Sequence, residues 1–329
     1  MKLSIVILCW NDLKVIGHCV RSICSGTHST EYELIISDNG STDGSIEFLR
    51  RNYPSAVIVE NGKNLGFGAG NNAGIRASWG DLVLILNPDT IVHDGALDRW
   101  VQFADRHPAV GGFGCRVLNA DGSYQISAYP FPTPWRFWLA ALSLRRLGRV
   151  SDIFTSDLYV GWAGDSERLV DWQSGCCVMF RSELLKRIGG FDEQFFYHFE
   201  EVDLCRRIWN EGYPIIFNPD VTITHLGGQS VNRFPLKFEL ERFRNRYRYF
   251  YKYFGRRGAR GCRRVALVEL WQQQLRSFVK RFIKRTPGLK GHMDIRQRVI
   301  LWNRKLDPVR FAEIGEEPDI GLAASEQTP

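Results

Sequence analysis

The sequence lacks several features, and each absence excludes a class of protein or site. No uninterrupted apolar segment reaches about 18 residues, so we expect no helix that spans a bilayer. No two of the eight cysteines have Cys-x-x-Cys spacing, and we therefore expect reduced thiols in a cytosolic compartment. No glycine-rich segment ends in Gly-Lys-Ser or Gly-Lys-Thr, which excludes a P-loop.

The composition is typical of a globular protein. With 329 residues, of which 44% are hydrophobic and 24% charged, one catalytic domain with extensions fits better than two equal domains. The formal charge of +7 predicts an anionic partner, and arginine and lysine concentrate between residues 233 and 310. The apolar run 3–10 is cut short by Asn11 and Asp12 without a small-residue cleavage site, so we expect a strand there and not a signal peptide.

Up to about residue 118, short apolar runs alternate with amphipathic segments, as in βαβ units around a mostly parallel sheet. We expect strands at 3–9, 33–37, 56–59 and 82–86, and helices at 12–24, 43–51 and 68–78. Ser41 and Thr42 are candidate caps of the second helix. Residues 1–118 are therefore the expected nucleotide-binding half of an α/β fold.

Residues 119–170 interrupt this alternation, and 129–138 are rich in proline and aromatic residues. This insert could cap an acceptor site or rest on a membrane surface, or it could be rigid with buried aromatics. Beyond it we expect a strand at 176–180, helices at 182–188 and 200–210, and strands at 215–217 and 221–224. The chain then becomes aromatic and cationic, and we expect residues 313–329 to be a frayed tail.

The turn Asn87-Pro88-Asp89 ends the apolar run 84–86 and would place a carboxylate at the carboxyl end of a buried strand, where open α/β sheets bind ligands. Asp89 could bind Mg²⁺ or Mn²⁺, and the cation would bridge it to a diphosphate. The neutral Asn87 should weaken such a site, so a second ligand is needed, and His225 at a strand end is the best candidate. An ordinary turn and a structural histidine are the alternatives.

Two further segments could hold a nucleotide. Asp38 follows a strand and could accept hydrogen bonds from a base or from ribose hydroxyls, although Asp-Asn-Gly often serves only as a turn. The glycine-rich segment 64–72 leads into a helix, where backbone amides could meet a diphosphate. Its glycines could instead serve close packing of that helix against a strand, and we favour this interpretation.

Three acidic residues, Glu200, Glu201 and Asp203, lie at the start of an expected helix, where the helix dipole favours negative charge. Helical spacing separates them, because Glu201 shares a stripe with apolar residues whereas Glu200 and Asp203 share one with Arg207. We therefore expect Glu201 to point inward, where burial would suit a general base. Asp203 and Arg207 are expected to form a surface ion pair.

The motifs together resemble those of the family 2 glycosyltransferases, in particular the bacterial rhamnosyltransferase-like branch that builds cell-wall and surface polysaccharides. The matching segments are Cys9-Trp10-Asn11, 38–45, 64–75, 86–90, Asp171-Trp172 with Ser174-Gly175, 189–192, 195–205 and 225–228. Several separated motifs in the right order are more specific than any one of them, and the resemblance covers residues 3–254.

The resemblance implies a GT-A fold, which is a Rossmann-like, mostly parallel sheet flanked by helices, and an inverting transfer by single displacement. It implies that Asp89 and His225 hold the metal, that Glu201 is the catalytic base, and that Asp38 holds the nucleobase. The further nucleotide-binding candidates are Cys9, Asn11, Asn39, Asn64, Gly66, Asn71, Asn87 and Pro88, and the candidate sugar pocket is formed by Trp172, Ser174 and Gly175.

The chain departs from the family pattern at two positions. Asn87 stands where many relatives carry the first Asp of an Asp-x-Asp motif, although the rhamnosyltransferase-like branch commonly has Asn-Pro-Asp. Glu201 stands where an Asp is usual, which leaves Glu200 as a rival base. The strength of metal binding and the identity of the base are therefore open.

The resemblance favours rhamnose transfer from dTDP-rhamnose, or transfer of another hexose from a UDP-sugar, to a hydroxyl of a growing glycan that is linked to a polyprenyl diphosphate. We expect residues 1–254 to be the catalytic domain, with an acceptor half at 171–254, and 255–329 to be a basic helical extension. Its segment 263–285 mixes apolar and basic residues like a helix that binds an anionic membrane. Such a protein would be cytoplasmic and peripheral on the inner face of the membrane. A helix packed on the catalytic domain, or one that forms a homodimer, is the alternative.

Two other classes of function compete with this prediction. A nucleotidyltransferase should carry a glycine-rich, basic phosphate loop near the N-terminus, and residues 9–20 contain none. A non-catalytic binder of nucleotide sugars or nucleic acid would depend on the basic C-terminal part. We expect no nucleic-acid partner, because the cations cluster outside the α/β half and no recognition motif accompanies them.

Overall fold

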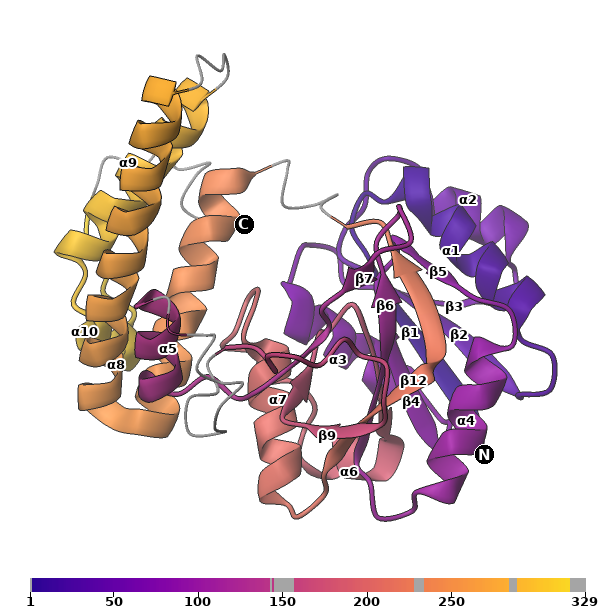
Figure 1. Cartoon of the computed structure of the whole chain (residues 1–329). Helices are drawn as coiled ribbons and strands as arrows, with labels where there is room; N and C mark the ends of the chain where they lie inside the picture. The colour runs from indigo at the N-terminus through magenta and orange to yellow at the C-terminus, as the bar shows by residue number, and fades with distance from the viewer. Residues whose placement is uncertain (1, 143, 145–156, 228–233, 284–288, 320–329) are drawn as a thin grey trace. The chain divides into compact units, whose positions relative to one another are not determined.

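The computed structural model describes residues 2–142, 144, 157–227, 234–283 and 289–319, without the side chains of 277–283 and 289–294. The chain forms two compact units, drawn in Figure 1. Unit 1 comprises Met1–Phe131, Gly161–Phe196 and Glu200–Gln229, and unit 2 comprises Pro132–Val160, Tyr197–Phe199 and Ser230–Pro329. Residues 234–254 thus group with the C-terminal helices, whereas the sequence-based division lies at 254.

Unit 1 is built around one sheet. Its strands are β1 (Leu3–Cys9), β2 (Tyr32–Asp38), β3 (Val57–Glu60), β4 (Leu82–Leu86), β5 (Thr90–Val92), β6 (Gly112–Leu118), β7 (Tyr124–Gln125), β9 (Arg168–Val170), β11 (Cys177–Arg181) and β12 (Ile215–His225). The order is β3-β2-β1-β4-β11-β6-β12-β5, with β7 paired to β6 and β9 to β12. Strands β1 to β4 are mutually parallel, β6 and β12 pair in parallel, and β11 is antiparallel to both of its neighbours. The expected mostly parallel sheet is confirmed.

Helices cover both faces of this sheet. Side chains of α1 (Leu13–Gly26), α2 (Ser45–Asn52) and α4 (Ala96–Arg106) form one core with Leu3, Ile5 and Ile7 of β1. Helix α3 (Phe67–Ala77) packs on the opposite face, where Gly70 and Gly74 lie against the intervening β1 residues. A strand buried on both faces needs apolar residues at every position, which explains the continuous apolar runs of β1 and β4.

The strand register determines which loops meet. Cys9 lies beside Asp38 across β1 and β2, and Ile7 lies beside Leu86 across β1 and β4. Because these strands are parallel, the residues that follow them emerge at the same edge of the sheet. Strand β12 ends at this edge as well, since it runs parallel to β6 and its His225 pairs with Thr90 of β5. The carboxyl ends of four strands therefore supply one loop cluster.

Two local expectations are wrong. Ser41 and Thr42 do not cap α2, because the helix begins at Ser45 and its first amide, Ser45 N, donates to Asp43 Oδ1 at 3.0 Å. The strands expected at 215–217 and 221–224 are one strand, β12, whose register shifts between Asn218 and Thr222. Pro219 lies within this shift, where an irregularity in the ladder accommodates its missing N–H.

The second half of unit 1 adds β8 (Ala128–Tyr129), β10 (Trp172–Gln173), α6 (Ser182–Arg187) and α7 (Glu200–Asn210). Helix α7 has the expected bounds, but Asp203 and Arg207 are not a surface ion pair. Asp203 is fully buried and accepts from Arg207 Nε at 2.7 Å, while Arg207 also donates to the carbonyls of Ile188 and Gly190 at 3.0 and 2.6 Å. The stripe that the sequence assigned to solvent faces the loop at 188–190, and Glu200 on the same stripe is buried as well.

Unit 2 is helical. It contains α5 (Pro134–Ala141), α8 (Pro235–Ile283), α9 (Leu289–Lys305) and α10 (Pro308–Ile314), and α5, α9 and α10 all pack on α8. The helical path of α8 is interrupted at Gly255, whose φ of 62° lies in the left-handed region. Tyr247 of α8 donates a short hydrogen bond to Asn303 of α9, and Trp302 packs beside it. The predicted helical C-terminal region is confirmed.

Part of the expected frayed tail is ordered in unit 2. Glu313 accepts hydrogen bonds from Tyr251 and Arg256 at 2.8 and 3.0 Å, and Glu317 accepts from Arg244 Nε at 2.7 Å. Residues 320–329 lie outside the described part of the chain. Of the helices that are described, none has a stretch that is both long and apolar enough to cross a bilayer. All eight cysteines are free thiols, as the spacing predicted, and only Cys24 is exposed.

Candidate active site

The turn after β4 and the end of β12 bring Asp89 and His225 together. Asp89 Oδ1 lies 3.2 Å from His225 Nε2, and only 8% and 13% of the two side chains are exposed. The backbone holds them there, because Leu226 N donates to Asp89 O at 2.9 Å and Thr90 Oγ1 donates to Asn87 O at 2.8 Å. The Asn87 amide lies 3.5 Å from the same imidazole nitrogen. The two expected metal ligands are therefore neighbours.

The other side of the His225 ring has its own partner, Gln125 of β7. His225 Nδ1 lies 3.2 Å from Gln125 Oε1, which can only accept, so Nδ1 carries the proton. Nε2 is then left to face the Asp89 carboxylate. Either a second proton joins these two atoms as an ion pair, or a metal ion takes the place of that proton. A carboxylate or amide that orients a ligating histidine in this way is a common feature of metal sites.

The donor set fits a cation that is shared with a phosphate group. One carboxylate oxygen and one imidazole nitrogen are ligands that Mn²⁺ accepts, and Mg²⁺ would depend more on oxygen ligands. Two side chains do not complete the coordination of either ion, and no cluster of three or more His, Cys, Asp or Glu that could hold a metal occurs in the described part of the chain. The remaining ligands would have to come from a bound diphosphate and water.

Asp38 and Asn11 shape the loops at the ends of β2 and β1. The Asp38 carboxylate is buried and accepts from Ser41 N at 3.0 Å, which is the turn contact that the alternative interpretation predicted. Asn11 adopts a left-handed φ of 58°, and its Oδ1 accepts from Thr42 N at 2.7 Å. Ser41 Oγ accepts from Asn11 N at 2.9 Å, so the two loops are tied together. One backbone amide does not use all lone pairs of a carboxylate, and Asp38 keeps capacity for a ligand.

Asn39 and Asn64 build the neighbouring loop through their own side chains. Asn39 Nδ2 donates to Asn64 Oδ1 at 3.2 Å and to Gly66 O at 3.0 Å, and Asn64 Oδ1 accepts from Gly66 N at 2.9 Å. Asn71 is fully buried in α3 and donates to Phe67 O at 2.9 Å. Cys9 is also fully buried. These contacts give the four residues a scaffold role beside the candidate nucleotide site, and direct contact with a nucleotide stays a prediction.

The glycines of the 64–72 segment serve close packing. A Cβ on Gly70 would lie 2.4 Å from Leu8 Cδ1, and one on Gly66, whose φ is 86°, would lie 2.5 Å from Phe196 O. The first amide of α3, Phe67 N, already donates to Phe196 O at 2.9 Å. These close contacts support the packing interpretation that we favoured from the sequence. The first helical amide, Phe67 N, is already hydrogen-bonded and is not available to a diphosphate.

Glu200 and Glu201 are both buried at the start of α7, but they face different neighbours. The Glu200 Cβ lies against Gly68 of α3, whereas the Glu201 Cβ lies against Gly175, next to the ring of Phe67. Burial raises the pKa of the Cys176 thiol to about 12, and the negative charges of Asp89 and Glu201 contribute to this rise. Gly175 precedes Cys176, whose carbonyl accepts from Asn87 N at 2.9 Å, so the segment beside Glu201 is joined to the turn that carries Asp89.

Of the candidate sugar-pocket residues, Trp172 lies in β10, which pairs with β8, and Ser174 and Gly175 follow that strand. Trp172 stacks on Tyr129 with ring centroids 4.5 Å apart and donates from Nε1 to Pro130 O at 3.0 Å. Ser174 N donates to Ser127 O at 2.7 Å. Part of the proline- and aromatic-rich insert is therefore anchored by Trp172 and Ser174, while α5 belongs to unit 2 and residues 161–170 belong to unit 1.

Sequence reasoning missed Gln125, the partner of the proposed metal ligand His225. It lies in a two-residue strand inside the insert, and its place depends on the pairing of Gln125 with Val117 of β6. A lone glutamine in an irregular segment carries no signal of such a role. Only the strand pairing brings it to the imidazole.

Comparison with known proteins identifies the family. A family model described as glycosyltransferase like family 2 matches residues 2–249. An N-acetylglucosaminyl-diphospho-decaprenol L-rhamnosyltransferase from Mycobacterium tuberculosis is 30% identical over 233 residues, which are 66% of this chain and 75% of the relative. A rhamnosyltransferase from Escherichia coli, WbbL, is 24% identical over 203 residues, which are 59% of this chain and 72% of the relative.

Solved structures share the fold. A mannosyltransferase from Pyrobaculum calidifontis in complex with GDP-Man and Mn²⁺ has a TM-score of 0.56 at 16% identity, covering 96% of this chain and 88% of that chain. S. aureus TarS 1–349 in complex with UDP-GlcNAc has a TM-score of 0.52 at 15% identity, with coverage of 95% and 90%. The fold class expected from the motifs, GT-A, is confirmed.

Proposed function

The chain belongs to the glycosyltransferase-like family 2, and from this premise we propose that it moves a sugar from a nucleotide-diphosphate donor to a hydroxyl of a glycan, with inversion at the anomeric carbon. The observation that carries the proposal is the pairing of Asp89 with His225 at the edge of the sheet where Asp38 also lies. Ligands bind at this edge in open α/β sheets. Glu201 lies against Gly175, and the next residue, Cys176, accepts at its carbonyl from Asn87 N at 2.9 Å, which supports a role for Glu201 at this site.

Each side chain has a role in this proposal. Asp38 accepts hydrogen bonds from the nucleobase or ribose, and Asp89 and His225 hold a divalent cation, Mn²⁺ or Mg²⁺. When bound, the cation neutralises charge on the departing diphosphate. Glu201 takes the proton of the acceptor hydroxyl while the oxygen of that hydroxyl bonds to the anomeric carbon. The bond between that carbon and the diphosphate oxygen breaks, and its electron pair leaves with the nucleoside diphosphate.

The donor and acceptor are proposed from the relatives. Two of them are named as rhamnosyltransferases, one of which acts on a diphospho-decaprenol substrate. Rhamnose from dTDP-rhamnose is the favoured donor, and a hexose from a UDP-sugar is the second choice. The acceptor is a glycan on a polyprenyl diphosphate, and the protein would work in the cytoplasm at the inner face of the membrane. In this proposal Trp172, Ser174 and Gly175 border the sugar.

A donor screen tests the function. We expect dTDP-rhamnose or a UDP-hexose to raise the melting temperature of the protein only when Mn²⁺ or Mg²⁺ is present, because a ligand of the native state stabilises it by mass action. The same donor should support transfer to a lipid-linked acceptor, and NMR of the product should show the inverted anomer. Asp89→Asn should abolish the metal-dependent shift. A shift that persists without metal, or a retained anomer, would contradict the proposal.

A further inference from the structure

The second half of α8, after the break at Gly255, presents one continuous stripe. Arg257, Arg260 and Arg264 are exposed on it, and Trp271 and Leu275 follow at helical spacing with 61% and 47% of their surface exposed. The three arginines have no ion-pair partner among the described residues. The stripe is therefore basic at one end and apolar at the other.

The opposite face of the same helix segment already has its packing partners. Ala259, Cys262, Ala266 and Leu270 are at most 2% exposed, and α9 and α10 pack on α8. Val265, Ala266 and Leu270 of the segment 263–285 therefore serve the core of unit 2. Trp271 and Leu275 do not, so the interior of this unit does not explain them.

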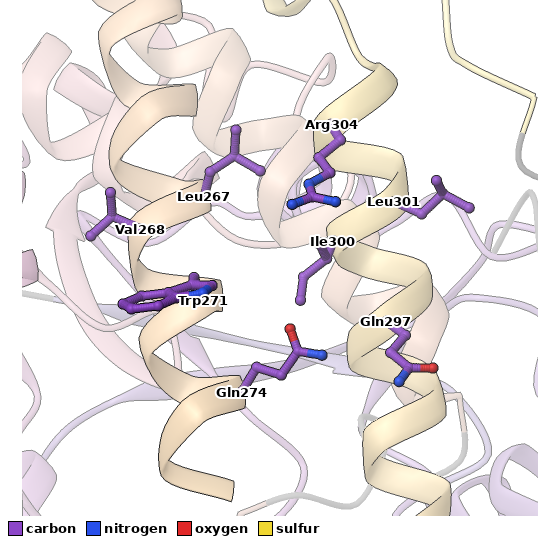
Figure 2. A pocket seen from close by; sticks show the side chains of 8 residues that line it. All are labelled: Leu267, Val268, Trp271, Gln274, Gln297, Ile300, Leu301 and Arg304. Atoms are coloured by element: carbon purple, nitrogen blue, oxygen red, sulfur yellow. The ribbon is translucent and has the colours of Figure 1, made fainter. Parts of the chain in front are cut away.

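A groove between α8 and α9 continues the apolar end of the stripe. It has a volume of about 490 Å³ and is lined by Leu267, Val268, Trp271 and Gln274 of α8 and by Gln297, Ile300, Leu301 and Arg304 of α9. Figure 2 shows Ile300 and the Arg304 guanidinium extending from α9 toward α8. Apolar walls with a cation at one side suit a hydrocarbon chain that carries an anionic head.

We propose that this stripe and groove bind the surface of an anionic lipid bilayer. Tryptophan is favoured at the boundary between headgroups and hydrocarbon, where the indole buries its ring and keeps its N–H near polar groups. The arginines of the stripe lie beside that boundary and complement lipid phosphates, which attract such cations near an anionic surface. The three arginines are spread along the helix, so they can contact several lipid phosphates of a surface at once, which a single small anionic ligand would not provide.

Charge disfavours a second copy of the chain as the occupant. In a two-fold dimer the same patch meets itself, so Arg257, Arg260 and Arg264 of one copy would face a surface that carries the same stripe. Like charges across an interface cost binding free energy. The bilayer removes this repulsion and buries Trp271 and Leu275 as well.

The inference goes beyond the proposed sugar transfer and does not depend on it, since every residue of the surface lies in unit 2 and the proposed catalytic residues lie in unit 1. The full chain is sedimented with vesicles of phosphatidylcholine alone and with vesicles that contain phosphatidylglycerol. We expect binding to the anionic vesicles only, and weaker binding at high salt because screening reduces the attraction. Equal binding to both kinds of vesicle would overturn the charge argument.

Matched variants locate the surface. Trp271→Ser with Leu275→Ser should weaken binding at least about ten-fold, since two exposed apolar side chains lose their burial in the bilayer. The control, Trp79→Ser with Leu169→Ser, removes side chains of unit 1 that are each 53% exposed, and it should bind like the unchanged protein. Equal loss in both pairs, or loss in neither, would refute the assignment.

A second set of variants tests the charges. Changing Arg257, Arg260 and Arg264 to Gln should weaken binding at low salt about 100-fold, while the same change at Lys14, Arg21 and Arg51, which are exposed in unit 1, should have little effect. Light scattering without lipid tests the alternative that a second copy of the chain occupies the patch. A dimer that becomes monomeric in the Trp271→Ser, Leu275→Ser variant would show that the patch is a self-association surface and would overturn the proposal.

Discussion

At the scale of single residues, the candidate site depends on the His225 imidazole, whose two nitrogens face different partners. Nε2 faces Asp89 at 3.2 Å, and Nδ1 faces Gln125 Oε1 at 3.2 Å. The glutamine fixes which nitrogen carries the proton, and with it which nitrogen has a lone pair for a cation. A residue that touches neither metal nor substrate can therefore control metal affinity.

Replacing Gln125 with Leu tests this control. Leu keeps most of the volume but cannot accept from Nδ1, so we expect the Mn²⁺ concentration for half-maximal stabilisation of the protein with nucleoside diphosphate to rise about 10- to 100-fold. Thermal unfolding over a Mn²⁺ series gives this value without an activity assay. Gln102→Leu, at an exposed position of α4, is the control, and an equal response in both variants would mean that Gln125 does not act through His225.

The two adjacent glutamates give the second residue-scale prediction. Glu201 lies against Gly175, and Glu200 lies against Gly68 of α3. If Glu201 is the base, Glu201→Gln should lower kcat by about 10²- to 10⁴-fold with little change in donor affinity. Glu200→Gln should retain far more activity. Turnover close to normal in Glu201→Gln, with loss in Glu200→Gln, would exchange the two roles.

At the scale of elements, α3 shows why glycines occur in a helix that lines the site. A Cβ on Gly74 would lie 2.4 Å from Val6 Cγ1, and Val6 is fully buried in β1 and β-branched, so it cannot rotate away easily. These glycines lower the intrinsic helix propensity by about 1 kcal/mol each, and in exchange they let the helix approach the strand closely. The position of α3 thereby fixes the loop at 64–66.

A pair of Gly→Ala variants tests the close approach. Gly74→Ala should lower the free energy of unfolding by about 1–3 kcal/mol, because overpacking outweighs the gain in helix propensity. Gly261→Ala, in α8 where an added Cβ meets nothing within 4 Å, should raise it by about 0.5–1 kcal/mol. Urea unfolding measures both. Stabilisation by Gly74→Ala would show that α3 has room to move off β1.

At the scale of the whole molecule, Asp98 shows how pH should act on unit 1. Its carboxylate connects α4 to the loop before β2, accepting from the backbone N–H groups of His28, Ser29 and Thr30 at 2.8, 3.0 and 2.8 Å. Burial acts to raise the pKa of Asp98, but these hydrogen bonds outweigh it and hold the pKa well below the usual value of 3.8. The folded state therefore binds the proton more weakly than the unfolded state does.

This difference predicts a loss of stability in acid. The contribution of Asp98 is complete above the unfolded pKa of 3.8 and is lost as the pH falls below it toward the lower folded value. Asp98→Asn should lower the free energy of unfolding at pH 7 by about 1–3 kcal/mol and should flatten the acid side of the stability curve. Urea unfolding at pH 7 and at pH 3 measures both effects. An unchanged acid slope in the variant would remove Asp98 from this role.

Local signals in the sequence were sufficient for most elements and for the residue types of the site. The bounds of β1, β4 and α7 follow from apolar runs and periodicity, and the turn at Asn87 to Asp89 follows from proline and the end of an apolar run. These signals depend only on neighbours along the chain. The same kind of signal misplaced Glu200 and Asp203, because a periodic stripe shows which residues share a face but not which loop later covers that face.

The sequence by itself determined that a parallel α/β sheet would present carboxylates and a histidine at strand ends, since strand patterns and turns are local properties of the chain. Only the tertiary structure decided that Asp89 meets His225, that Gln125 orients the ring, and that Asp203 is buried with Arg207. Each of these contacts depends on segments that are brought together by strand pairing or packing. The register of strands that are distant in the sequence sets how close these segments lie. No local pattern contains that register.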